Sequence, residues 1–278
     1  MTIYISTLCL ANGNNMFQVL ETYARAGLRN VELNKTETSR NGIDGLSPDK
    51  FKQYALGFIA HNFPHPKEPF IVSLTSQDPM TLKRSRDQIK KAIEFCHSLG
   101  IRLFTFHAGF RVDPNNKVRR VIPYDTAFAT LIESIDEISS YARQMGVKIA
   151  VENNVEDGRS RFPLLYKAEE FERLWQKLPS TNVGILVDLG HVKATSHCLG
   201  FDKYEFIDKV KDRVFAFHLN ENNGQRDEEK KLDETSWCFE VIGRKCFTKL
   251  PVVLEATKVT IDEITQQVSL IGKSLQKE

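Results

Sequence analysis

The chain has 278 residues, of which 41% are hydrophobic and 27% charged, and its formal net charge is +2. This balance is typical of a soluble globular enzyme, and the length fits one large α/β barrel or two ordinary domains. A charge so close to neutral argues against a broad nucleic-acid-binding surface, although it leaves room for a local basic patch.

Eight short runs of apolar and β-branched residues alternate with longer amphipathic patterns, and each run predicts a strand. In chain order the expected strands are Ile3–Leu8, Asn30–Leu33, Gly57–Asn62, Arg102–His107, Lys148–Glu152, Gly184–Asp188, Val214–His218 and Pro251–Glu255. Helices are expected between them, including Thr81–Leu99 and Asp125–Met145. Gly27, Gly100 and Gly146 precede strands, which is the usual place for a glycine that ends a helix.

Eight such units within this length predict an α/β fold, a closed (β/α)₈ TIM barrel that occupies residues 1–278 as a single domain. A doubly wound open sheet would instead need a glycine-rich phosphate loop after its first strand. The segment 11–15, Ala-Asn-Gly-Asn-Asn, does not supply one. The most strongly charged segment, Arg226–Glu234, follows the seventh expected strand and is either a solvated loop or part of a site.

The cysteines and the N-terminal residues predict a cytoplasmic location. The cysteines are odd in number and contain no C-x-x-C pair, which argues against a disulfide framework or a zinc knuckle; they are Cys9, Cys96, Cys198, Cys238 and Cys246. The first residues lack the basic and apolar regions of a signal peptide. No run of about 18 apolar residues occurs, so no membrane span or membrane partner is expected.

Four successive expected strands, the fifth to the eighth, end in a side chain that can bind a metal. These residues are Glu152, Asp188, His218 and Glu255. Alone, Asp188 could cap the following helix and His218 could be a hydrogen-bonded core histidine. The four residues together are better explained by a shared site, because the ends of barrel strands converge on one mouth and buried carboxylates need a partner or a cation. The sequence therefore predicts one shared divalent metal site.

The motifs around these residues resemble those of the xylose isomerase-like TIM barrels. This superfamily includes sugar phosphate isomerases and epimerases as well as the endonuclease IV-type phosphodiesterases. The resemblance extends from the first strand to about Glu255. It is carried by V-E-N-N at 151–154, V-D-L-G-H at 187–191, H-L-N-E-N at 218–222, V-L-E-A at 253–256, H-N-F-P at 61–64 and F-T-F-H-A-G at 104–109.

The resemblance implies a metal-dependent sugar or sugar-phosphate isomerase or epimerase that works through an enediolate. Its epimerase branch places the metal ligands at Glu152, Asp188, His218 and Glu255, with Glu152 and Glu255 acting also as catalytic acid and base on opposite faces of the sugar. Mostly oxygen ligands with one imidazole suit Mn²⁺, Mg²⁺ or Co²⁺, with Zn²⁺ left open.

Substrate contacts are expected from six further residues: His191, His107, His61, Asn154, Asn220 and Arg226. His191 matches a substrate-contacting histidine of the epimerase branch. In the nuclease branch His107, and a histidine near His61 or His65, would instead bind additional zinc ions. Arg226 could equally belong to a surface loop.

A competing function is that of an endonuclease IV-type metal-dependent phosphodiesterase acting on abasic DNA. That branch has a D-x-H pair after the seventh strand, where this chain has Asp227, Glu228 and Glu229, so a third metal is in doubt. A keto-inositol dehydratase would use the same enediolate chemistry, whereas the intact set of four ligands counts against a sugar-sensing barrel without activity. The expected partner is a small sugar or sugar phosphate, not nucleic acid, and a homo-oligomer is left open.

Overall fold

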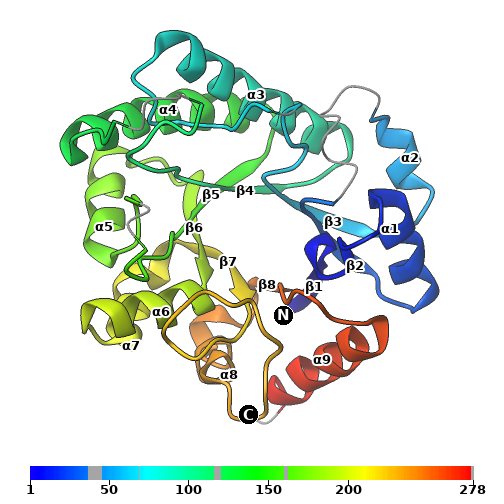
Figure 1. Ribbon diagram of the computed structural model, residues 1–278. Coiled ribbons are helices and arrows are strands. Elements are labelled where there is room, and N and C mark those ends of the chain that lie inside the picture. The colour runs from blue at the N-terminus through cyan, green and yellow to red at the C-terminus, as the bar shows by residue number, and fades with distance from the viewer. Residues whose placement is uncertain (37–45, 68, 116–119, 160–161, 277–278) are drawn as a thin grey trace.

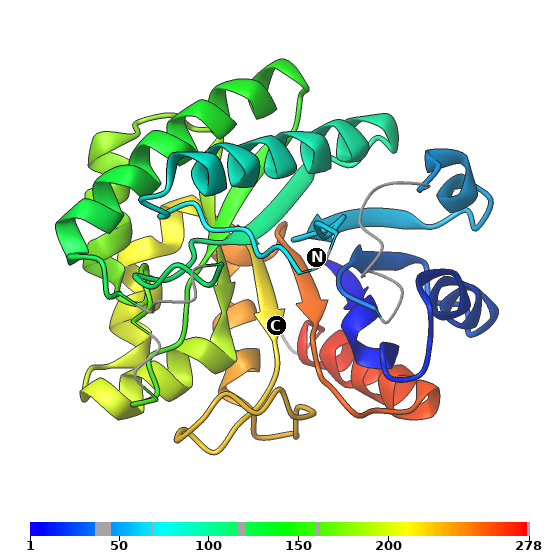
Figure 2. The same ribbon diagram turned by 45° about the horizontal axis from the view of Figure 1, so that its top comes forward.

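The structure is a computed structural model that describes residues 1–36, 46–67, 69–115, 120–159 and 162–276. Eight parallel strands pair in chain order and close into a barrel, with helices around it (Figures 1 and 2). The strands are β1 Thr2–Ser6, β2 Asn30–Leu33, β3 Gly57–His61, β4 Leu103–His107, β5 Lys148–Glu152, β6 Val183–Asp188, β7 Val214–Leu219 and β8 Pro251–Leu254. The predicted (β/α)₈ barrel is confirmed, and the doubly wound sheet is excluded.

Helices follow the strands in the order expected for βα units. They are α1 Met16–Arg25, α2 Pro48–Lys52, α3 Pro79–Ser98, α4 Tyr124–Gln144, α5 Ala168–Lys177, α6 Leu189–Leu199, α7 Lys203–Val210, α8 Trp237–Ile242 and α9 Ile261–Ser274. Gly27, Gly100 and Gly146 have positive φ angles of 78°, 73° and 65° just after helices, as the sequence predicted. No helix of the described residues is both long enough and apolar enough to cross a membrane.

The first strand is shorter than the sequence predicted. It was expected to run to Leu8, but β1 ends at Ser6 and a 3₁₀ helix spans Thr7–Leu10. The Ser6 hydroxyl accepts a hydrogen bond from the Leu8 amide, and the Thr7 hydroxyl donates to the Asn34 carbonyl at 3.0 Å. These side-chain bonds, one local and one to the segment after β2, replace strand pairing, and a purely apolar pattern cannot reveal them.

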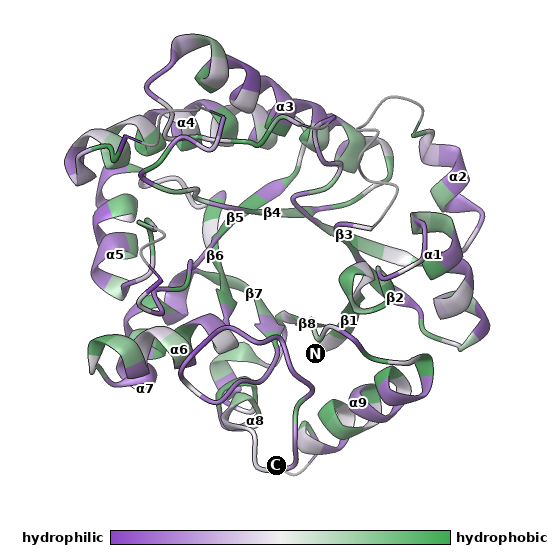
Figure 3. Ribbon diagram, viewed as in Figure 1, coloured by the Kyte–Doolittle hydropathy of each residue, from purple (hydrophilic) through white to green (hydrophobic). Residues whose placement is uncertain are grey.

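The barrel interior has an apolar floor and a polar upper part. The floor consists of small and aliphatic side chains: Ile59, Leu103, Ala150, Leu186, Ala216 and Val253. Larger apolar residues fill the space between strands and helices, which is the main core. The hydropathy colouring in Figure 3 shows the long loop between β7 and α8 as mainly hydrophilic. Polar side chains are therefore gathered near the carboxyl ends of the strands, where barrel sites form.

Candidate metal centre and substrate cavity

The four side chains at the ends of β5 to β8 lie together. Glu152, Asp188, His218 and Glu255 are all buried and each offers a ligand atom within 4.8 Å of the others. Nδ1 of His218 lies 2.6 Å from Oε2 of Glu255, 3.5 Å from Oε1 of Glu152 and 3.8 Å from Oδ2 of Asp188. The strands converge as the sequence predicted, and they bring three carboxylates and one imidazole to one point.

Two polar atoms of this cluster are fully buried and make no well-aligned hydrogen bond, although each lies close to other ionisable side chains. They are Oε2 of Glu152 and Nδ1 of His218. Buried polar atoms are almost always satisfied, and buried carboxylates side by side repel one another. A divalent cation would accept electron pairs from these atoms and neutralise the carboxylates. The donor set therefore fits a metal ion.

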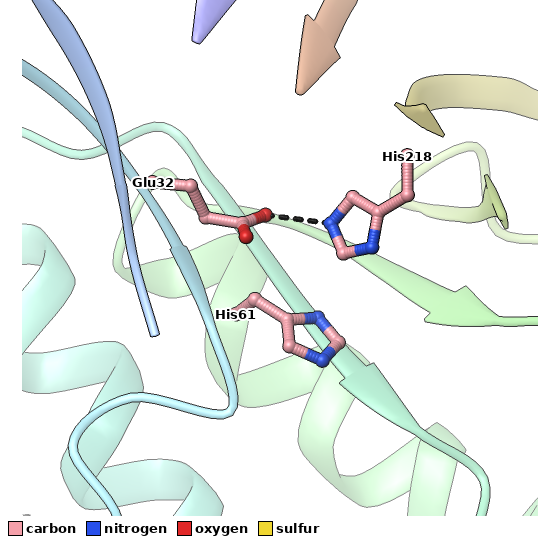
Figure 4. Close-up of side chains that lie close together, drawn as sticks. All are labelled: Glu32, His61 and His218. Carbon is pink, nitrogen blue, oxygen red and sulfur yellow. Dashed lines mark hydrogen bonds and ion pairs between the residues drawn. The ribbon is translucent and has the colours of Figure 1, made fainter. Parts of the chain in front are cut away.

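Glu32 on β2 orients His218 from the side opposite the carboxylates. Its Oε2 accepts a hydrogen bond from Nε2 of His218 at 2.8 Å, and both side chains are fully buried (Figure 4). With the proton fixed on Nε2, Nδ1 presents its lone pair to the cluster. Glu32 was not among the site residues predicted from the sequence. The signal was an acid inside the apolar run Asn30–Leu33, where a buried charge needs a partner.

Two amides hold the carboxylates of Asp188 and Glu255. Asn220 donates to Oδ2 of Asp188 at 2.9 Å, and Asn34 donates to Oε1 of Glu255 at 3.0 Å. Oδ1 of Asp188 accepts from the backbone N–H of His191 at 2.7 Å, so Asp188 also caps α6. Asn220, expected to contact substrate, therefore orients a cluster carboxylate instead.

A second group of possible ligands adjoins the first and shares Glu152. Its Oε2 lies 3.0 Å from Nδ1 of His107 and 3.3 Å from Nε2 of His61. The amide of Asn62 donates to Nε2 of His61, and Nδ1 of His61 donates to Thr105, each at 2.8 Å. Nε2 of His61 is therefore unprotonated and lies beside a carboxylate oxygen, and it could bind a cation there in place of its hydrogen bond from Asn62.

His191 lies at the N-terminus of α6 and faces the loop after β7. Its Nδ1 donates to the carbonyl of Asn153 at 2.8 Å, and its Nε2 lies 3.3 Å from Oδ2 of Asp227. Burial alone would lower the pKa of His191, but Asp188, Asp227 and Glu152 outweigh it and raise that pKa well above its usual value. His191 is thus poised as a hydrogen-bond donor at the edge of the site.

Burial and neighbouring charges shift the pKa values of several groups in opposite directions. Burial lowers the pKa of His61 well below its usual range, which keeps that ring neutral. Burial opposes a charge on His218, yet Glu255 and Glu32 raise its pKa. Burial and the carboxylates of Glu255 and neighbouring acids raise the pKa of Glu229 to about 8. Separated pKa values of this kind are typical of functional sites.

A cavity of about 320 Å³ opens above the cluster. Glu152 and Glu255 line it, whereas Asp188 and His218 do not and lie buried beneath. Among the expected substrate contacts, those that line the cavity are His61, His107, Asn154 and His191; those that do not are Asn220 and Arg226. The walls also include Asp227 and Glu229, which the sequence analysis considered only as metal ligands of the nuclease branch.

Asn154 lines the cavity and also bonds its wall, whereas Arg226 does not line the cavity. The amide of Asn154 donates to the carbonyls of Gly109 and Leu164, at 3.2 and 2.6 Å, so it holds the cavity wall together. Arg226 is exposed to solvent in the loop after β7, within the charged segment Arg226–Glu234. A charged residue close in sequence to a site need not point into it, because the loop path decides its direction.

The sequence profile of the family described as "Xylose isomerase-like TIM barrel" matches residues 20–255. The chain belongs to this family. A solved structure described as a D-tagatose 3-epimerase-like protein superimposes with a TM-score of 0.77 at 19% identity, covering 99% of this chain and 97% of that one. A D-psicose 3-epimerase from Clostridium cellulolyticum H10 superimposes with a TM-score of 0.70 at 14% identity, over 99% and 96% of the two chains. At identities this low, the superpositions establish the shared fold alone.

Sequence relatives of this barrel include proteins named for the other branch. A probable endonuclease 4 from Thermoplasma acidophilum is 26% identical over 180 residues, which are 63% of this chain and 56% of that protein. A probable endonuclease 4 from Persephonella marina is 23% identical over 208 residues, 68% of each chain. The chain thus matches a little over half of the Thermoplasma protein. These relatives do not decide which reaction the chain catalyses, so that question depends on the geometry of the site.

Proposed function

We propose that this barrel is a metal-dependent isomerase or epimerase of a small sugar or sugar derivative. The observation that carries the proposal is that only two of the four cluster residues also line the cavity. Asp188 and His218 are enclosed and suited only to hold an ion, whereas the carboxyl groups of Glu152 and Glu255 also line the cavity. Two carboxylates that reach both an ion and a substrate are what proton transfer at a carbon atom requires. The sugar epimerases among the structural neighbours support this proposal.

The four proposed ligands are Glu152, Asp188, His218 and Glu255. A divalent ion held there would polarise a substrate carbonyl and stabilise the negative charge that develops on its oxygen. One glutamate removes the proton from the carbon beside the carbonyl, which leaves an enediolate. The other returns a proton to the opposite face of that carbon to give an epimer, or a proton reaches the neighbouring carbon to give an isomer. Asn34 restrains Glu255 for this step through its bond to Oε1.

His191, His107 and His61 are proposed to contact the substrate from the cavity wall. The raised pKa of His191 makes it a donor to a sugar hydroxyl or to a developing oxyanion. The neutral ring of His61 lines the cavity while its Nε2 accepts a hydrogen bond from Asn62. Oxygen-rich coordination with one imidazole favours Mn²⁺, Mg²⁺ or Co²⁺ as the ion.

A second candidate function is metal-dependent hydrolysis of a phosphodiester, and one observation favours it. The group formed by His61, His107 and Glu152 could hold a second ion beside the first, with Glu152 bridging the two. Paired ions can stabilise both the attacking and the leaving oxygen in phosphodiester cleavage. The absence of a histidine at Glu229, where that branch has one, and the net charge of +2 weigh against this function.

One set of measurements separates the two functions. The protein is dialysed, its metal content is determined by elemental analysis, and the Mn²⁺-loaded form is incubated with a panel of ketoses in deuterated solvent. The proposed function predicts one bound ion, or two, and exchange of a ketose α-proton with deuterium by NMR. The same preparation is tested on a duplex that contains an abasic site. Three ions per chain together with strand cleavage and no exchange would overturn the proposal.

A further inference from the structure

A second cavity of about 590 Å³ adjoins the catalytic cavity on the side of β3 and β4. The two cavities share five lining residues, which are Lys35, Asn62, His65, His107 and Phe110. We call this second cavity the side compartment. Since His107 also contacts Glu152, the side compartment begins within one side chain of the catalytic carboxylates.

The walls of the side compartment are mainly apolar. They include Phe70, Ile71, Val72, Ile89 and Phe104. Ile89 and Phe104 are buried core residues, so that wall is rigid. The facing wall is also held in place, because the guanidinium of Arg84 lies 4.0 Å from the Phe70 ring centre and Asn115 bonds both backbone groups of Ile71.

One polar atom at the junction of the two cavities has no hydrogen-bond partner among the described residues. It is Nε2 of His65, which is buried. Buried polar atoms of this kind need an explanation, and a ligand that passes from one cavity to the other would supply a partner at this point. An apolar compartment with a few polar side chains at its entrance is a common form of small-molecule site.

We infer that the side compartment binds an apolar, ring-sized group attached to the sugar, so that the substrate is an aryl or alkyl conjugate of a sugar that keeps a free carbonyl, such as a keto-glycoside. The sugar part of this substrate rests on the proposed function, and its apolar part rests on the side compartment. A free sugar carries hydroxyl groups around its ring, and these would lose their hydrogen bonds with water against Phe70, Val72 and Phe104. An aryl or alkyl group loses none and gains apolar contact. The catalytic cavity then holds the sugar, and His65 contacts the link between the two parts.

The test uses isothermal titration calorimetry on the Mg²⁺-loaded protein. The probes are phenol and matched phenyl and methyl glycosides of D-glucose, D-galactose and D-xylose. These glycosides lack a carbonyl and therefore serve as unreactive binding analogues. Val72→Trp fills the side compartment, and Ile71→Asp places a charge in its wall at a position that is 53% exposed and therefore tolerant of substitution. Leu199→Trp, at a 40% exposed residue that lines neither cavity, is the matched control.

Phenol is expected to bind the wild type and the control alike, and to bind Val72→Trp and Ile71→Asp about tenfold more weakly. At least one phenyl glycoside should bind about tenfold more tightly than its methyl partner, and Val72→Trp should abolish that preference. The inference is overturned if phenol does not bind, or if neither variant changes its affinity. If phenol binding depends on Val72 while no phenyl glycoside exceeds phenol in affinity, the sugar half of the inference is wrong, whereas the proposed function is judged separately by the exchange of the ketose proton.

Discussion

At the scale of single residues, the site depends on carboxylates that are packed more closely than water-exposed acids would tolerate. Glu152, Asp188 and Glu255 each contribute a ligand atom to one buried cluster. Burial raises the pKa of Asp188 to about 6, whereas the histidines around Glu152 outweigh its burial and lower its pKa. The cluster is thus an electrostatic unit in which each side chain depends on the others.

Glu152→Gln and Glu255→Gln should each reduce the kcat for ketose epimerisation by at least about 10²-fold, because an amide can neither remove nor return a proton. The measurement is turnover at saturating Mn²⁺, with the melting temperature as the check on folding. Glu133→Gln, at a side chain that is 74% exposed, is the control and should turn over like the wild type. Wild-type turnover in either cluster variant would refute the assignment of that glutamate.

Glu229→Gln should stabilise the metal-free protein at pH 8 but not at pH 4.5. The unfolded chain loses this proton near pH 4.5, whereas the folded chain holds it until about pH 8. Unfolding therefore releases a proton between these values, and the penalty on the folded state grows as the pH rises and then levels off. The gain in unfolding free energy at pH 8 should be up to a few kcal/mol.

The measurement for Glu229 is urea denaturation in EDTA at the two pH values. Glu228→Gln is the matched control on the neighbouring residue. Glu228 is paired with Lys230 at 2.8 Å and its pKa is lowered, chiefly by that pair, so its replacement should give no gain at pH 8. A pH-independent effect of Glu229→Gln would contradict the raised pKa.

At the scale of elements, β6 and β7 are placed so that Asp188 and His218 face each other. The register pairs these two residues directly, after a shift between Ile185 and Leu186. Gly184 lies just before this shift, and a Cβ there would meet the Phe215 ring at 2.5 Å and the Arg213 carbonyl at 2.7 Å. The close approach of the two strands depends on the missing side chain.

Gly184→Ala should lower the unfolding free energy by about 1–3 kcal/mol or more, because the new methyl group overlaps the neighbouring strand. Gly272→Ala is the matched control in α9, where a Cβ would meet nothing within 4 Å. It should instead raise the unfolding free energy by about 0.4–1 kcal/mol through the entropy of the unfolded chain. Both are measured by chemical denaturation, and equal effects of the two substitutions would exclude the steric explanation.

At the scale of the whole molecule, strands from both ends of the chain share the site, so a bound ion should stabilise the entire barrel. Removal of metal with EDTA should lower the Tm, and Mn²⁺ at about 100 times its Kd should raise it by about 5–10 °C, since binding contributes about 2.7 kcal/mol. Thermal unfolding with chelator and then with metal measures this. Asp188→Asn should show a much smaller shift. An identical Tm under both conditions would contradict the metal site.

The sequence by itself determined the barrel and the four cluster residues, for a local reason. A buried parallel strand is a short apolar run, and a charged residue at its end is visible in the same few letters, as in 149–152 and 185–188. Once eight such runs imply a closed barrel, topology alone brings their ends to one mouth. The strand boundaries that moved, such as the end of β1 at Ser6, are set by side-chain hydrogen bonds with no periodic signal.

Only the tertiary structure decided which polar residues serve the cluster and which face solvent. Glu32 bonds His218 across 186 positions of the chain, and Asn34 bonds Glu255 across 221. Such pairs follow from the register of strands that are distant in sequence. Asn220 turns toward Asp188 and Arg226 toward water for the same kind of reason. The side compartment also forms only when segments around β3 and β4 pack together, because a cavity is a property of side chains in contact and not of any one segment.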